Sequence, residues 1–121
     1  MTSLERFFQE HTYLPEDKEV VISSRFLYEG KPAVWRIRAL REGEFQNRVC
    51  YENKDAALCV AAVAEPNLQD PDLWKSYKAK QAEEALLKML TPGEYLKLLD
   101  AVKELNGFEK RKREQKETAK N

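Results

Sequence analysis

The sequence predicts a small, mainly helical α+β domain in which one antiparallel β-hairpin packs on a helical bundle. One observation is the alternation of apolar and polar residues on both sides of a turn at Glu29-Gly30. A second is the succession of helix starts and apolar stripes between residues 54 and 107. The chain has 121 residues, 42% of them hydrophobic, which is enough for a single core.

The charges are balanced in number but unevenly placed. The chain has 21 basic and 21 acidic residues, whereas a duplex-DNA binder usually has a basic excess. Residues 109–121 hold six basic and three acidic residues, so they carry +3 and residues 1–108 carry −3. We expect one domain over residues 1–108 and a mobile basic tail over 109–121, because the tail lacks large apolar residues. No apolar run approaches the roughly 20 residues that span a bilayer, and no secretory signal opens the chain.

The N-terminal residues predict a short helix. Thr2 and Glu5 have the spacing of a capping box, and the helix ends near His11. Its apolar face consists of Leu4, Phe7 and Phe8. Residues 13–18, which contain Pro15, form a connector to the first strand.

Residues 19–40 predict the hairpin. A two-residue turn at Glu29-Gly30 sets the register, because glycine accepts a positive φ there. The residues placed opposite each other are Phe26 and Ala33, Ile22 and Ile37, and Val20 and Ala39. Trp35 falls on the same, mostly apolar face. The rest of the chain offers only helices, so both hairpin edges are free to receive a partner strand unless something covers them.

The remaining elements are predicted as helices. Residues 42–51 are a weak candidate with Phe45, Val49 and Cys50 facing inward. Asp55 starts a run, AALCVAAVA, that is apolar on all sides and predicts a buried central helix ended by Pro66. Asp70-Pro71 starts a short helix, and residues 81–90 form another. The stripe of that second helix is Ala82, Ala85, Leu86, Met89 and Leu90.

The last helix has the clearest boundaries in the chain. Thr91-Pro92-Gly93-Glu94 combines a cap, a proline in the first turn and a glutamate in capping-box position. Its apolar stripe is Tyr95, Leu98, Leu99, Val102 and Leu105. Asn106-Gly107 predicts a left-handed C-cap.

Catalytic chemistry finds little support, and no cofactor or metal site is expected. His11 is the only histidine, and we expect it at the surface. Cys50 and Cys59 lie in or beside apolar segments, which favours structural roles. The four glycines do not cluster, and Glu83-Glu84 follows a polar helix face. The sequence therefore argues against an enzyme.

Two groups of residues are candidates for partner contact. Trp74 and Tyr77, with Leu73, lie on a short helix where burial is not forced, and aromatic residues are enriched in interfaces. The alternative is that they close one end of the core. Lys110, Arg111 and Arg113 belong to a cationic cluster that can attract acidic surfaces. Pairs at i,i+4 spacing and the lack of aromatics favour a solubilising or partner-contact tail over RNA binding.

Several segments, in order, resemble the XkdN-like family of phage tail assembly chaperones, named from a defective PBSX-type Bacillus prophage. The segments are IRAL at 37–40, AEPNL at 64–68, Asp72-Leu73 to Tyr77, LLKMLTPGEY at 86–95 and LNGF at 105–108. Arg41-Glu42-Gly43 departs from the threonine and acidic helix start more usual after the IRAL strand.

The resemblance implies a non-enzymatic tail assembly chaperone. Such a protein binds the long, largely helical tape-measure protein and keeps it soluble in the host cytoplasm, and it is absent from the finished particle. Other tail proteins or a second copy of the chain are further expected partners. Two alternatives stay open: a structural adaptor retained in the tail, and a small RNA-binding regulator acting through residues 109–121.

Overall fold

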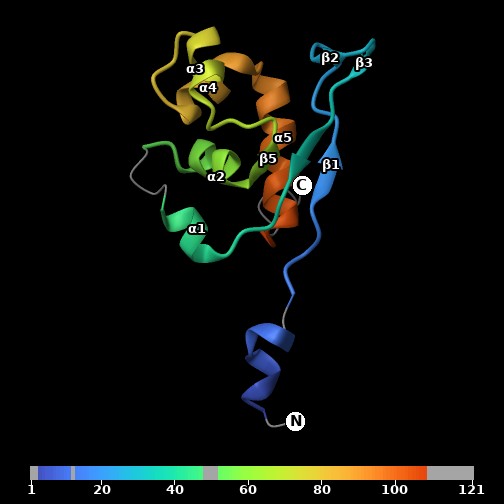
Figure 1. Ribbon diagram of the computed structural model, residues 1–121, viewed down its shortest axis with the longest axis vertical. Helices are drawn as coiled ribbons and strands as arrows, with labels where there is room; N and C mark the ends of the chain where they lie inside the picture. The colour runs from blue at the N-terminus through green and yellow to red at the C-terminus, as the bar shows by residue number, and fades with distance from the viewer. Residues whose placement is uncertain (1–2, 12, 48–51, 109–121) are drawn as a thin grey trace, which may run out of the picture.

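The computed structural model describes residues 3–11, 13–47 and 52–108, and it confirms the α+β class. The strands are β1 (Lys18–Val20), β2 (Leu27–Tyr28), β3 (Lys31–Pro32), β4 (Trp35–Ile37) and β5 (Val63–Glu65). The helices are α1 (Glu42–Gln46), α2 (Lys54–Ala62), α3 (Pro71–Ser76), α4 (Ala82–Met89) and α5 (Pro92–Leu105). In Figure 1 the helices gather to one side of the sheet, and β1 runs along the opposite side.

The predicted turn is present and the predicted pairing of Phe26 with Ala33 is confirmed, because the Ala33 amide donates to the Phe26 carbonyl, but the register farther from the turn is wrong. Leu27 pairs with Pro32 and Tyr28 with Lys31, so Glu29 and Gly30 form the two-residue turn, with φ of 52° and 79°. Farther from the turn, Val20 lies opposite Trp35 and not opposite Ala39. Likewise Ile37 faces Lys18, so its predicted pairing with Ile22 is also wrong.

The register shifts because residues 21–25 leave the ladder between β1 and β2. Ile22 turns into the core, where it is 3% exposed, while the side chain of Arg25 reaches the start of α5. The slip is four residues along the first strand, an even number, so the same side chains still face the core. The predicted apolar face is therefore confirmed at Trp35, Ile37 and Ala39, which are all buried.

A third strand was not predicted. β5 pairs antiparallel with β4, with Arg36 opposite Glu65 and Ile37 opposite Val63, in the sheet order β1-β4-β5. The expectation that only helices follow the hairpin is wrong, and β5 covers the β4 edge that the sequence left open to a partner strand. The run from Asp55 predicts a continuous helix because its apolar residues alone do not distinguish helix from strand.

The core lies between the sheet and the helices. Trp35 is 1% exposed, and its ring meets Phe26 edge-on at 5.9 Å between centroids. α2 is buried on all sides from Ala56 to Ala62, as predicted, and its alanines allow neighbouring elements to approach closely. The stripes of α4 and α5 are confirmed by the burial of Ala82, Ala85, Leu86, Met89, Leu98, Leu99 and Val102.

Helix boundaries follow the caps that the sequence predicts. The side chain of Asp70 accepts a hydrogen bond from the Asp72 amide at the start of α3. Thr91 and Glu94 form the expected reciprocal capping box of α5. At the other end Gly107 has a φ of +84°, and the Phe108 amide donates to the Lys103 carbonyl at 2.8 Å. This arrangement is a Schellman motif.

Two predicted helices differ from the structure. The N-terminal segment forms 3₁₀ turns at Glu5–Phe7 and Gln9–His11, and in Figure 1 it projects away from the body. Its predicted apolar face is exposed, to 77% at Phe7, and Thr2 lies outside the described residues. α1 is shorter than predicted and ends at Gln46, while residues 48–51 lie outside the described part.

Candidate functional site

The aromatic candidates for partner contact come together on α3. Asp70 and Pro71 start this helix, and one turn later Leu73 and Trp74 face the core. Leu73, Trp74 and Tyr77 are all partly buried and pack against the core cluster. The indole Nε1–H of Trp74 donates to the Leu68 carbonyl at 2.7 Å. The three side chains therefore close one end of the core, and each still presents part of its surface to solvent.

α3 ends in a backbone conformation that is unusual for its residue. The Lys78 amide donates to the Lys75 carbonyl at 3.1 Å, and the Ala79 amide donates to the Trp74 carbonyl at 2.8 Å. This is the Schellman pattern that also ends α5, with Lys78 in the position that Gly107 occupies there. Lys78 has a φ of 55°, where a side chain costs roughly 1–2 kcal/mol relative to glycine.

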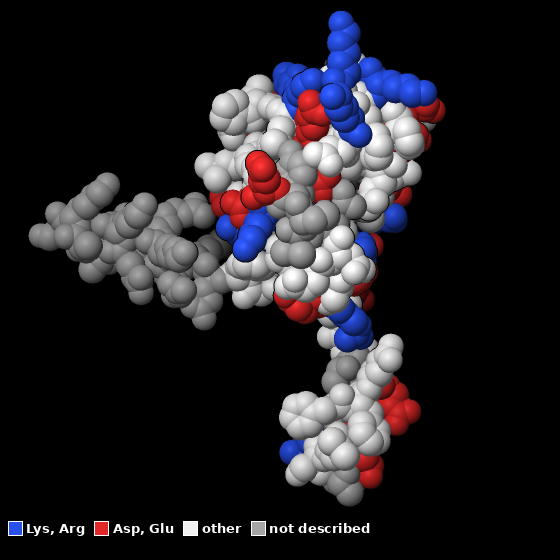
Figure 2. Space-filling view, turned by 90° about the vertical axis from the view of Figure 1, so that its left-hand side faces the viewer, with Lys and Arg blue, Asp and Glu red and all other residues white. Residues whose placement is uncertain are grey.

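Four lysines surround this end of the molecule, and we call them the α3–α4 lysine cluster: Lys75, Lys78, Lys80 and Lys88. Figure 2 shows basic side chains gathered at the top of the face on which α3 and α4 lie. The Lys88 ammonium donates to the Lys78 carbonyl at 2.9 Å, which ties α4 to the end of α3. Sequence inspection missed the cluster because four lysines spread over 14 positions form no run.

Glu84, the carboxylate within the cluster, already interacts with Lys80 and Lys88. Glu84 Oε1 accepts the Lys80 amide at 2.7 Å, and Oε2 lies 3.5 Å from the Lys88 ammonium. The hydrogen bond from the Lys80 backbone, followed by the charge of Lys88, holds the pKa of Glu84 below its usual range. Glu84 is therefore ionised at neutral pH and offsets one of the four positive charges.

The basic tail candidates cannot be placed beside this surface. Lys110, Arg111 and Arg113 all lie outside the described residues, so their role in partner contact stays a prediction.

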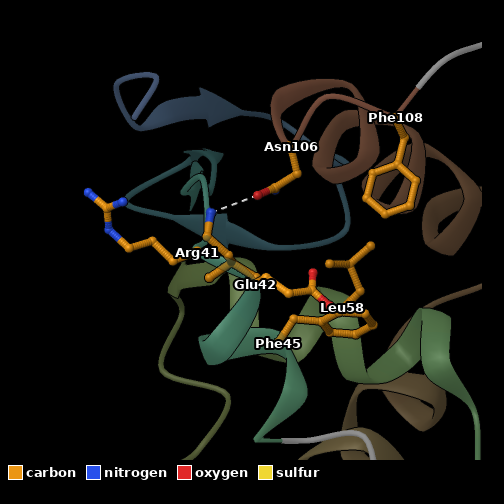
Figure 3. A pocket seen from close by; sticks show the side chains of 7 residues that line it. Arg41, Glu42, Phe45, Leu58, Asn106 and Phe108 are labelled. Atoms are coloured by element: carbon orange, nitrogen blue, oxygen red, sulfur yellow. Dashed lines mark hydrogen bonds between the residues drawn. The ribbon is translucent and has the colours of Figure 1, made fainter. Parts of the chain in front are cut away.

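A small cavity lies at the opposite end of the body, between α1 and the C-terminal end of α5 (Figure 3). Its walls come from Leu40, Arg41, Glu42, Phe45, Leu58, Asn106 and Phe108. The Asn106 carboxamide oxygen accepts the Leu40 amide at 2.7 Å, and its Nδ2 donates to the Arg38 carbonyl at 3.3 Å. Asn106 thus hydrogen-bonds to the chain after β4 as a neighbouring strand would.

The described residues hold little reactive chemistry. Cys59 is 0% exposed, and burial raises the pKa of its thiol to about 12, so it stays protonated and unreactive. No group of three or more His, Cys, Asp or Glu residues suited to a metal ion occurs within residues 3–11, 13–47 and 52–108. Over the same residues, no helix has the length and apolar character needed to cross a bilayer.

Comparison with known proteins identifies the family. The model of the phage XkdN-like tail assembly chaperone protein family matches residues 42–120. The chain belongs to this family. The match covers α1 to α5, and therefore includes both the α3–α4 surface and the cavity beside Asn106.

A solved structure supports the fold of this chaperone-family chain. The crystal structure of the protein YqbN superposes with a TM-score of 0.75 at 24% sequence identity, covering 90% of this chain and 99% of that chain. At this identity the likeness concerns the fold alone. No curated protein matches the chain.

Proposed function

We propose that this protein binds the tape-measure protein of its phage or prophage and keeps it soluble while the tail is assembled. The observation that carries the proposal is the family match over residues 42–120. In this role the protein acts without catalysis in the host cytoplasm, and it leaves before the virion is complete.

The candidate contact surface is the exposed part of Leu73, Trp74 and Tyr77 on α3. These side chains are held in place by the core and by the Trp74–Leu68 hydrogen bond, so little conformational entropy is lost when a partner covers them. The charged residues, which make up 35% of the chain, help to keep the complex in solution. Reversible apolar contacts of this kind suppress aggregation and still allow the client to be handed on.

Co-expression with the tape-measure protein tests the proposal. We expect a larger soluble fraction of the tape-measure protein and a complex that survives gel filtration. The Trp74→Arg variant, which places a charge at the contact, should lose the complex, provided that circular dichroism shows it to be folded, since Trp74 also packs against the core. No complex and no gain in solubility with the wild-type chain contradicts the proposal.

Mass spectrometry of purified particles tests where the protein resides. The chaperone role predicts its absence from mature virions, or traces far below one copy per tail protein ring. Stoichiometric presence favours a structural adaptor that is retained in the tail.

A further inference from the structure

The fold brings the members of the α3–α4 lysine cluster together, because a chain of backbone and side-chain contacts joins all four of them. The Lys75 carbonyl accepts the Lys78 amide, the Lys78 carbonyl accepts the Lys88 ammonium, and Lys80 and Lys88 both contact Glu84. The turn between α3 and α4 therefore holds these residues close together.

The cluster presents a net positive charge to solvent. Within the described residues, Lys88 is paired with Glu84, and no ion pair joins Lys75, Lys78 or Lys80 to a carboxylate. Of the other carboxylates on these helices, Glu83 in the first turn of α4 is 2% exposed, whereas Asp72 in the first turn of α3 is exposed. Lys75, Lys78 and Lys80 thus form no ion pair within the described residues, although the charge of Lys80 also acts on Glu84, and the cluster lies in a body that carries −3 over residues 1–108.

The lysines border the partly buried apolar side chains of α3. Lys75 lies between Trp74 and Tyr77 in the sequence, and Lys78 follows Tyr77 directly. An aromatic centre with a charged margin is the usual anatomy of a protein interface. Lysine is depleted from interface centres but suits a margin, where it steers a partner of opposite charge.

The positive φ of Lys78 is a second observation that points to a function for the positive charge of the cluster. Glycine fits a φ of 55° without strain, and α5 has glycine at the same position of its C-terminal motif. Strained residues persist where the side chain contributes something that the favoured residue cannot. Here the side chain of Lys78 adds a positive charge beside Tyr77.

We propose that the α3–α4 lysine cluster binds an acidic amphipathic segment of a protein partner, whose apolar residues cover Trp74 and Tyr77 while its carboxylates meet the lysines. The identity of the partner rests on the proposed function, in which this segment belongs to the tape-measure protein. A protein is favoured over a nucleic acid because the cluster has no arginine, whose planar fork suits phosphate best. Residues 1–108 carry a net charge of −3, which also repels a long polyanion such as a nucleic acid.

Matched variants test the proposal. The triple variant Lys75→Gln, Lys78→Gln, Lys80→Gln removes three charges from the cluster. The control, Lys18→Gln, Lys54→Gln, Lys97→Gln, removes three exposed lysines from other parts of the surface. Circular dichroism and urea unfolding establish that both variants are folded before binding is measured.

The probes are three fluorescent ligands measured by anisotropy at 50 and 300 mM salt: a peptide with Glu and Leu at helical spacing, its Lys-for-Glu counterpart, and oligouridine. We expect the acidic peptide to bind the wild-type chain and the control variant. Neutralising three margin charges weakens its binding to the cluster variant by about tenfold at 50 mM salt. The basic peptide does not bind.

Three results overturn the proposal: no binding of the acidic peptide, equal weakening in both variants, or tighter binding of oligouridine through the same lysines. Pull-down of the tape-measure protein separates this proposal from the proposed function. A tape-measure complex that the cluster variant retains overturns the cluster's role and leaves the chaperone function intact. Binding of the acidic peptide without any tape-measure complex supports the cluster's role and contradicts the chaperone function.

Discussion

The guanidinium of Arg25 and the carboxylate of Glu94 form a two-pronged ion pair between residues 69 positions apart. Arg25 Nε lies 2.8 Å from Glu94 Oε2, and Nη2 lies 2.6 Å from Oε1. The same Nη2 donates to the Met89 carbonyl at 2.9 Å, at the end of α4. Because Glu94 also caps α5, Arg25 joins residues 21–25, which leave the strand ladder, to two helices.

Replacing Arg25 by Met makes the protein less sensitive to acid. Hydrogen bonds from Arg25, then from Ser23 and the Thr91 amide, hold the pKa of Glu94 well below its usual range. This stabilisation is complete above the unfolded-state pKa of about 4.3 and is lost as the pH falls towards the folded-state pKa. We therefore expect a lower Tm at pH 7 in Arg25→Met, and a smaller further drop in Tm between pH 7 and pH 3 than in the wild type.

The control is Lys97→Met, which removes an exposed cation from α5 at a distance from this pair. It should keep the wild-type dependence of Tm on pH. An Arg25→Met variant with an unchanged acid dependence contradicts the assignment of Glu94.

Replacing Asn106 by Ala destabilises the domain more than an ordinary turn substitution. The change leaves the Leu40 amide without its acceptor and removes the donor to the Arg38 carbonyl, in a part-buried setting. We expect a loss of about 1–2 kcal/mol in the free energy of unfolding, measured with urea. Asn106→Asp at pH 7 should lose at least as much, because a carboxylate oxygen replaces the Nδ2 that donates to the Arg38 and Val102 carbonyl oxygens.

Asn67→Ala is the matched control for Asn106. The Asn67 side chain accepts only the local, exposed Gln69 amide. Its replacement should cost about 0.5 kcal/mol or less. Equal losses of unfolding free energy in the two alanine variants contradict a stabilising role for the hydrogen bonds of Asn106 with residues 38 and 40.

Replacing Lys78 by Gly stabilises the fold. Glycine removes the side-chain strain at a φ of 55°, although it also increases the entropy of the unfolded chain. The net expectation is a gain of about 0.5–1 kcal/mol in urea unfolding. Lys75→Gly, within the regular part of α3, should instead lose about 1 kcal/mol. A destabilised Lys78→Gly variant shows that Lys78 is not strained in solution.

Cys59 should react with thiol reagents only after unfolding. It is buried in α2, and desolvation raises its pKa to about 12. In a Cys50→Ser background, labelling by a disulfide reagent at pH 8 should follow the rate of global unfolding. Since the unfolded thiol ionises near pH 8.5, Cys59 contributes stability below that pH and loses it as the pH rises towards 12. Rapid labelling of the native protein contradicts this burial.

The sequence predicts helix ends and apolar faces well because these depend on neighbouring residues. The caps at Asp70 and Thr91, the turn at Glu29-Gly30 and the C-cap at Gly107 each satisfy backbone groups within a few positions. The register of β1 and the strand β5 depend on distant partners. Ala and Val before Pro66 are compatible with helix or strand, and only pairing with β4 decides between them.

The candidate surface was predicted in part. Leu73, Trp74 and Tyr77 do share the α3 surface, and their partner contact stays a prediction. The lysines around them could not be grouped from spacing, because Lys78 and Lys88 meet through a turn whose backbone conformation is not visible in the sequence. Asn106 could be predicted as a cap, but its bonds to residues 38 and 40 require the tertiary arrangement.

The position of α5 at the end of the body has a consequence for biosynthesis. The hairpin is translated before the helices, so the core around Trp35 and Ile37 stays incomplete until Leu98 and Val102 have been translated. At about 5–20 residues per second, this delay lasts several seconds. Asn106, which joins the chain after β4, is added later still. A nascent chain of this chaperone family is thus itself an aggregation-prone polypeptide until its final helix is complete.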